Sequence, residues 1–127
     1  MNPPISAGEL QAIREWLGLT TDALAAILDV NHRTYRAWES GRSRIPHALR
    51  ERLELVEAMT ETAVSELLAE LTKMDAPTAR VYRTDAEMHA ARPGMKHLTA
   101  RWWRHVVARA VQEVPGVAVV SAVDNRE

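Results

Sequence analysis

The sequence predicts a mainly helical α+β protein, with a helical bundle first and a small strand-helix-helix-strand unit after it. Apolar residues recur three and four positions apart along most of the first 75 positions, which is the spacing of helices with one buried face. Two short β-type runs, 80–83 and 117–123, occur only in the remainder. A length of 127 residues suits one compact domain or two small ones. We therefore divide the chain into 1–75 and 76–127.

The first predicted helix begins with a capping box, in which Ser6 precedes Glu9 by three residues. Leu10, Ile13 and Leu17 then fall on one face, and the helix ends at Gly18.

The stretch from Thr20 to Gly41 predicts two short helices joined by a tight turn. Thr20 can cap the first helix and Asn31 the second. Asp29 favours a turn between them, because Asp competes for backbone hydrogen bonds and tolerates turn conformations. Gly41 suits the left-handed position that follows a helix. Helix, turn and helix in this order can place the second helix in a DNA major groove.

This stretch resembles the helix-turn-helix of the Xre and lambda-repressor class without a gap. The residues that match are Gly18-Leu19-Thr20, Leu24-Ala25, Val30, Trp38-Glu39, Gly41 and Pro46. Asp29 stands where that class often has Gly, and Asp can adopt the same conformation at modest cost. The resemblance implies sequence-specific DNA binding by the helix 32–39. It also implies a structural ion pair between Arg14 and Glu39.

Three residues at the start of this recognition helix are predicted to contact DNA bases, namely His32, Arg33 and Arg36. Each arginine can form two hydrogen bonds to guanine O6 and N7, the commonest specific contact in the major groove. His32 could contact a base or a phosphate. The alternative role for exposed arginines is solubility.

A second set of residues is predicted to contact DNA phosphates: Thr20, Thr21, Asn31, Tyr35, Ser40, Arg42, Ser43 and Arg44. Such contacts position a helix without reading sequence. Thr20 and Thr21 serve equally well as plain caps, and Tyr35 lies on the side where the resembled class has core residues. Positions 31–52 hold six arginines against two acids, although the whole chain has a net charge of −1.

A long helical pattern starts at Pro46 and continues to Met74, with no Gly or Pro until Pro77. One long helix or two helices with a break near Thr60 would satisfy it. Its exposed face is acidic and should point away from a duplex. Its apolar face should pack on the C-terminal half, on a second copy, or on both.

The second half is predicted as a strand at 80–83, a helix from Thr84 to Arg92, a helix from Thr99 to about Glu113 and a strand at 117–123. Two strands are too few for a stable free sheet, so pairing across a two-fold axis or cover by the long helix is expected. The whole order resembles autorepressors associated with anti-CRISPR operons and their YdiL-like relatives, with matches at Arg80-Val81-Tyr82 and Arg101-Trp102. The resemblance implies a homodimer on an inverted repeat. The residues predicted for its interface are Trp102, Trp103, Val106 and Val119.

Other classes of function find little support in the sequence. There is no cysteine, signal-peptide pattern or apolar run of membrane-spanning length, so we expect a cytoplasmic protein. The resemblance implies a bacterial or phage origin. His97 and His105 lie eight apart and predict no metal site, and no motif predicts a cofactor or an enzyme. Antitoxin, adaptor and activator roles remain open.

The C-terminal half carries its own basic residues. Positions 80–109 hold seven Lys and Arg against two acids. Arg101 and Arg104 lie off the apolar stripe of the last helix and support a hypothesis of RNA binding. The alternatives are solubility or pairing with the acidic face of the long helix.

Overall fold

The computed structural model describes residues 4–125, and the chain forms two compact units, Met1–Ala58 and Met59–Glu127. It is mainly helical with one small parallel sheet, which confirms the predicted fold class. The two units divide within a helix, whereas we predicted a functional boundary near residue 75, and that boundary stays a prediction.

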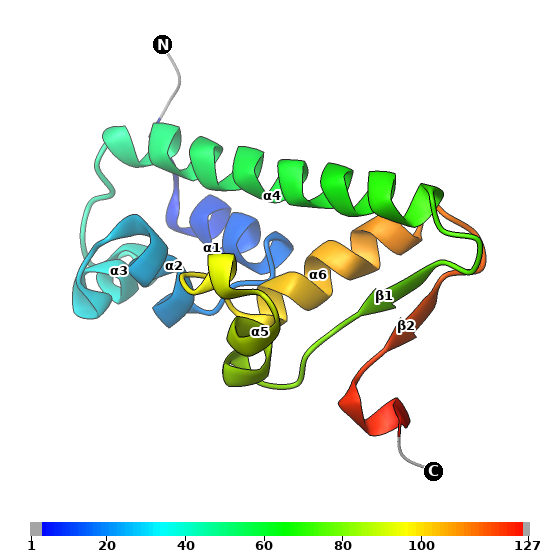
Figure 1. Cartoon of the computed structure of the whole chain (residues 1–127). Coiled ribbons are helices and arrows are strands. Elements are labelled where there is room, and N and C mark those ends of the chain that lie inside the picture. Colours follow the sequence, from blue (N-terminus) through cyan, green and yellow to red (C-terminus); the bar gives the residue numbers. More distant parts are fainter. Residues whose placement is uncertain (1–3, 126–127) are drawn as a thin grey trace. The chain divides into compact units, whose positions relative to one another are not determined.

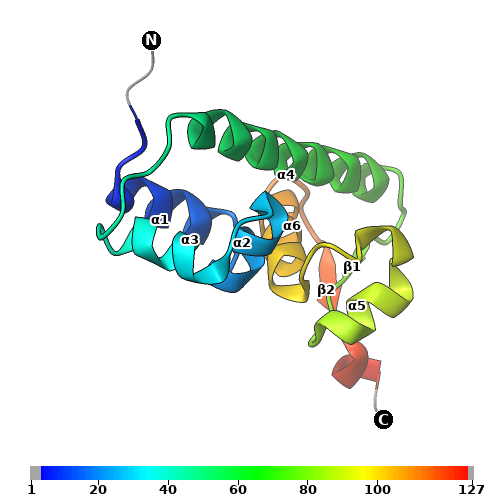
Figure 2. The same ribbon diagram turned by 90° about the vertical axis from the view of Figure 1, so that its left-hand side faces the viewer.

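The first unit contains α1 (Ala7–Trp16), α2 (Thr21–Leu28) and α3 (His32–Glu39), and both α1 and α2 pack on α3 (Figure 2). Each helix begins at its predicted cap. The side chains of Ser6, Thr20 and Asn31 accept hydrogen bonds from backbone N–H groups in the first turns of the three helices.

Two turns set the direction of α3. Asp29 adopts the left-handed conformation, with φ 56° and ψ 47°, and ends α2 as predicted. Gly41 has φ 81°, which suits a residue without a Cβ, and its N–H donates to the carbonyl of Trp38. Tight turns at both ends keep α3 short and present its outer face to solvent.

The long helical pattern forms one uninterrupted helix, α4 (Ala48–Thr72). It begins two residues after Pro46, and the Leu49 N–H in its first turn donates to the Pro46 carbonyl. Met74, predicted on the buried face, is 41% exposed because it lies beyond the end of α4.

The second unit contains, besides the end of α4, β1 (Thr78–Arg80), α5 (Asp85–Ala91), the short 3₁₀ helix η1 (Pro93–Met95), α6 (Ala100–Val111), β2 (Ala118–Val120) and η2 (Ala122–Asn125). Figure 1 shows the two strands side by side. They pair in parallel within one chain, with Thr78 opposite Ala118 and Arg80 opposite Val120.

Both strands are shorter than predicted, and β1 starts earlier than the predicted range 80–83. The Val81 N–H still donates to the Val120 carbonyl, at 2.8 Å, but the pairing then ends. The Trp103 indole donates to the Arg80 carbonyl, and the Arg104 guanidinium donates to the Tyr82 carbonyl. The strand-like sequence continues through Tyr82, but the Tyr82 carbonyl bonds α6 and not β2.

The helix α6 supplies much of the second unit's core. Its Trp102 indole donates to the buried Thr60 hydroxyl at 3.0 Å. Trp102, Trp103 and Val106 are each at most 2% exposed, so the protein's own fold already covers them. Their predicted place in a dimer interface does not fit this burial. Val119, the fourth predicted interface residue, is 46% exposed.

Candidate nucleic-acid interface

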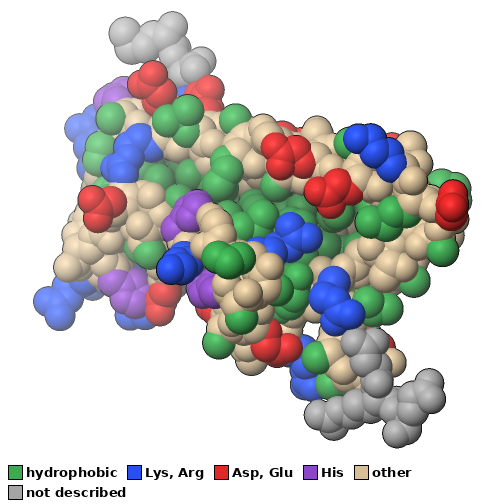
Figure 3. Space-filling view, in the orientation of Figure 1, with side chains coloured by type: hydrophobic (Ala, Val, Ile, Leu, Met, Phe, Trp, Pro, Cys, Tyr) green, Lys and Arg blue, Asp and Glu red, His purple; other side chains and the backbone are tan. Residues whose placement is uncertain are grey.

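The outer face of α3 is basic and open to solvent. Arg33 and Arg36 are exposed, and His32 is half-buried. Together with Asn31, Thr34 and Arg42, these residues line an open hollow of about 670 Å³. In the space-filling view, basic and histidine side chains lie over α3 and the loop after it (Figure 3). The structure therefore brings the three predicted base-contacting residues onto one surface.

The predicted phosphate contacts border this surface. Ser40, Arg42, Ser43 and Arg44 are all exposed in or beside the loop after α3, and the Arg42 Nε donates to the Ser40 hydroxyl at 3.2 Å. The Thr20 hydroxyl and the side-chain oxygen Oδ1 of Asn31 act as caps. The side-chain NH2 group of Asn31 is then available to donate to a phosphate. The Thr21 hydroxyl donates to the Asp22 carboxylate at 3.3 Å.

Tyr35 does not fit the predicted phosphate contact. Its side chain is completely buried, and its hydroxyl donates to the Glu39 carboxylate at 2.6 Å. A buried, occupied hydroxyl cannot reach a phosphate, so Tyr35 belongs to the core that supports α3.

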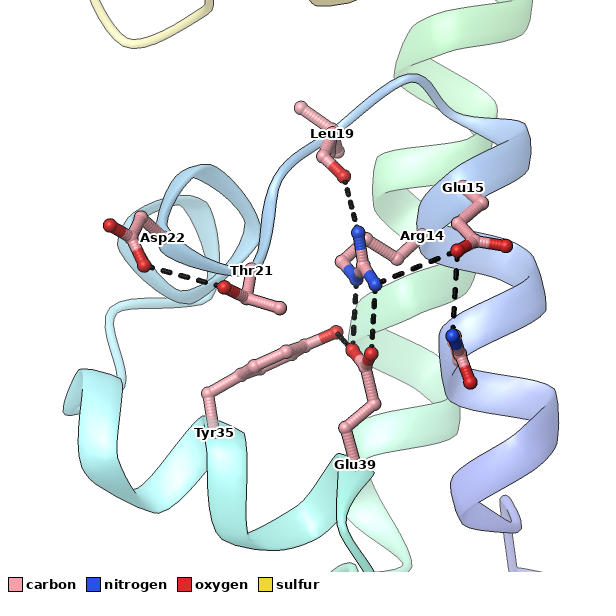
Figure 4. Close-up of polar contacts among 8 residues, drawn as sticks. Arg14, Glu15, Leu19, Thr21, Asp22, Tyr35 and Glu39 are labelled. Atoms are coloured by element: carbon pink, nitrogen blue, oxygen red, sulfur yellow. Dashed lines mark hydrogen bonds and ion pairs between the residues drawn. The ribbon is translucent and has the colours of Figure 1, made fainter.

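Arg14 of α1 and Glu39 of α3 form a two-bond ion pair, as Figure 4 shows. The Arg14 Nε and Nη2 donate to the two Glu39 oxygens at 2.9 and 2.8 Å, and Nη1 donates to the Leu19 carbonyl at 3.0 Å. The side chains are only 14% and 12% exposed. Parallel N–H bonds to a carboxylate fix both distance and orientation. This pair holds the end of α3 against α1.

The ion pair and Tyr35 perturb one another's protonation. Burial alone would raise the pKa of the Glu39 carboxyl, but the hydrogen bonds from Arg14 and Tyr35 outweigh it and lower that pKa. The hydrogen bond to Glu39 raises the pKa of Arg14. Burial and then the same carboxylate raise the pKa of Tyr35 well above its ordinary value. At neutral pH, Glu39 is charged and Tyr35 is neutral.

The lowered pKa of Glu39 predicts acid destabilisation. A carboxyl whose folded pKa lies below its unfolded value stabilises the fold above the unfolded value, here about 4.5, and that contribution disappears as pH falls through the folded pKa. We expect the urea midpoint to fall in this acid range. Glu39→Gln should be less stable at neutral pH and should show a flatter acid response. If the urea midpoint depends on pH in the same way in both proteins, Glu39 is not the source of the acid destabilisation.

Internal pairing leaves the outer surface positive. Arg14 neutralises Glu39, and Arg50 of α4 pairs with Glu9 of α1 at 3.0 Å. Arg33, Arg36, Arg42 and Arg44 then dominate the exposed charge around α3. Four exposed guanidinium groups on one short segment form a surface to which DNA phosphates would be attracted.

Asp22 is the residue at this surface that sequence reasoning missed. Its carboxylate contacts the His32 Nε2 and lies 3.6 Å from the Arg36 Nη2. An acid in the first turn of α2 is a common helix-start feature, which hid this second role. The signal available in the sequence was that Asp22 lies at the start of the helix that the turn joins to the recognition helix.

The C-terminal basic residues are divided by the structure. Arg109 pairs with Glu61 on α4, so this basic residue pairs with the acidic face of the long helix, which was the alternative to RNA binding. Arg101 is exposed, and Arg104 is exposed while also bonding the Tyr82 carbonyl. RNA binding through Arg101 and Arg104 stays a prediction.

Within residues 4–125, no three His, Asp or Glu side chains gather closely enough to hold a metal ion. None of the helices in this described part has both the length and the apolar character needed to cross a bilayer.

The fold and surface define a helix-turn-helix protein with an exposed basic second helix. The model of the Aca2/YdiL-like family matches residues 5–114, which is most of the chain. The chain belongs to this Aca2/YdiL-like family, and membership points to an anti-CRISPR-associated transcriptional regulator. No curated protein matches the chain.

Proposed function

We propose that this protein is a homodimeric, sequence-specific DNA-binding repressor that covers an inverted-repeat operator, including one at its own promoter. The observation that carries the proposal is the exposed basic face of α3, whose C-terminal end is held against α1 by the buried Arg14–Glu39 ion pair. The chain's membership in a family of regulators supports it. No cofactor enters this function.

The size of α3 suits the DNA major groove. An α-helix with its side chains is about 10–12 Å in diameter, and the groove that would admit it is about 12 Å wide. Arg33 and Arg36 lie three residues apart and share one face of the helix. Arg42 and Arg44 follow beside it and would contact the flanking phosphates, which sets the register of α3 on the duplex.

Dimerisation is assigned to the second half of the chain, 76–127, and DNA binding to 1–75. Val119 on β2 and Val123 on η2 are 46% and 38% exposed, and these large apolar side chains are available for an interface there. A two-fold dimer of helix-turn-helix domains reads two half-sites about 34 Å apart, which predicts a palindromic operator.

The experiment that tests this function is selection of bound duplexes from a random DNA pool, followed by titration at increasing salt. We expect an enriched inverted repeat with guanine in each half-site. Steep salt dependence without an enriched sequence would reduce the protein to a phosphate binder. Absence of duplex binding would refute the proposal and favour an antitoxin or adaptor role. An enriched single half-site would refute the dimer alone.

A further inference from the structure

Asp22 places a carboxylate on the surface proposed to face DNA. It lies in the first turn of α2, and its side chain is 64% exposed. Across the turn it contacts the His32 Nε2 and approaches the Arg36 Nη2 at 3.6 Å. One acidic side chain thus connects α2 to two of the three residues predicted to contact bases.

A carboxylate here opposes simple phosphate binding. An acid near a duplex repels the phosphates, and four arginines beside it would bind DNA more tightly without it. A pure electrostatic surface would therefore have no use for Asp22. Its contacts favour a different effect, which is control over where two flexible side chains can reach.

We infer that Asp22 is a positioning residue that determines DNA specificity by holding His32 and Arg36 in one arrangement and by weakening binding to other sequences. The inference rests on the proposed function and adds a residue to it. Arg36 is 59% exposed and its long side chain has many rotamers. The Asp22 carboxylate, which also contacts His32 and Thr21, restricts the guanidinium to a subset of them, so the bidentate geometry that reads guanine is prepared before binding.

The competing explanation is that Asp22 only stabilises α2. A negative side chain in the first turn interacts favourably with the helix dipole, and Asp22 also accepts a hydrogen bond from the Thr21 hydroxyl. This structural role predicts a lower melting temperature for an Asp22 variant, with the ranking of DNA sequences unchanged. The positioning role predicts a changed ranking in a protein that still folds.

The test compares Asp22→Asn with the wild-type protein on the selected operator, on the same operator with the guanine read by Arg36 replaced, and on random duplex. We expect discrimination against the replaced base to fall about tenfold, within the range of roughly 5- to 150-fold that one bidentate base contact supplies. Binding to random duplex should strengthen roughly two- to threefold, the size of a screened interaction between charges several ångströms apart.

Asp29→Asn is the matched control, because it removes the same charge from the other end of α2. Asn tolerates the left-handed conformation of Asp29, so the turn should persist. The control should leave discrimination unchanged. If both variants change affinity equally on every duplex, Asp22 contributes charge alone and the inference is wrong.

A double-variant cycle separates positioning from general damage. In an Arg36→Ala background, Asp22→Asn should lose most of its effect on discrimination, because its target side chain is gone. An undiminished effect in that background would overturn the inference. The two proposals also fail in distinguishable ways. Wild-type protein that ranks no sequences refutes both, whereas ranking that depends on Arg36 and ignores Asp22 refutes only the role of Asp22.

Discussion

Arg36→Ala should weaken binding to the selected operator by roughly 5- to 150-fold, because removing one bidentate bond to guanine costs about 1–3 kcal/mol. Arg33→Ala should act similarly at a different base pair of the half-site. Both side chains are exposed on α3 and pack into no core, so the variants should keep the wild-type melting temperature. Fluorescence titration against the operator and against single-base replacements would measure the weakening and locate each base that is read.

Arg44→Ala is the control for this prediction. Arg44 is exposed beyond the recognition helix and is predicted to contact a phosphate. Its removal should weaken operator and random duplex by the same factor and reduce the salt slope by about one. If Arg36→Ala behaves in this same uniform way, Arg36 contacts the backbone and does not read a base.

Arg14→Met should destabilise the first unit by about 3–5 kcal/mol, because it leaves the Glu39 carboxylate buried without its partner. The substitution removes both bonds to Glu39 and the bond to the Leu19 carbonyl. A destabilisation of this size is a large part of the stability of a small domain. Urea unfolding followed by tryptophan fluorescence would measure it, since Trp38 is buried on α3.

Two comparisons test the reason for that destabilisation. Arg14→Met combined with Glu39→Gln should be more stable than Arg14→Met alone, because no charge is then buried unpaired. Arg50→Ala removes the more exposed pair with Glu9, and it should cost roughly 1 kcal/mol or less. Equal destabilisation by Arg14→Met and Arg50→Ala would show that burial of the Arg14–Glu39 pair does not matter.

The helix-turn-helix was predictable because its determinants are local. Thr20, Asp29 and Asn31 each act within three residues of their own position. In the structure Thr20 and Asn31 cap the starts of α2 and α3, and Asp29 makes the turn between them. Such effects need no knowledge of what packs where. The fold class and the order of the elements in the second half follow from periodicity for the same reason.

The features that sequence reasoning missed depend on packing. The tyrosine at position 35 is amphipathic, and its bond to Glu39 lies within α3, but only the packing of α1 and α2 on α3 decides that its side chain is buried. The apolar stripe of α6 could cover a partner or a core, and the structure shows a core for Trp102, Trp103 and Val106. The contact of Asp22 with His32 likewise requires the turn to bring α2 against α3.

The parallel pairing of β1 with β2 has a consequence for how the protein is made. Thr78 pairs with Ala118, so β1 leaves the ribosome 40 residues before its partner. At roughly 5–20 residues per second, that delay is about 2–8 seconds. During this time β1 has no β2 to pair with, while α5 and α6, which lie between the two strands in the sequence, are synthesised. The sheet of the second unit therefore cannot form until residues 118–120 have been synthesised.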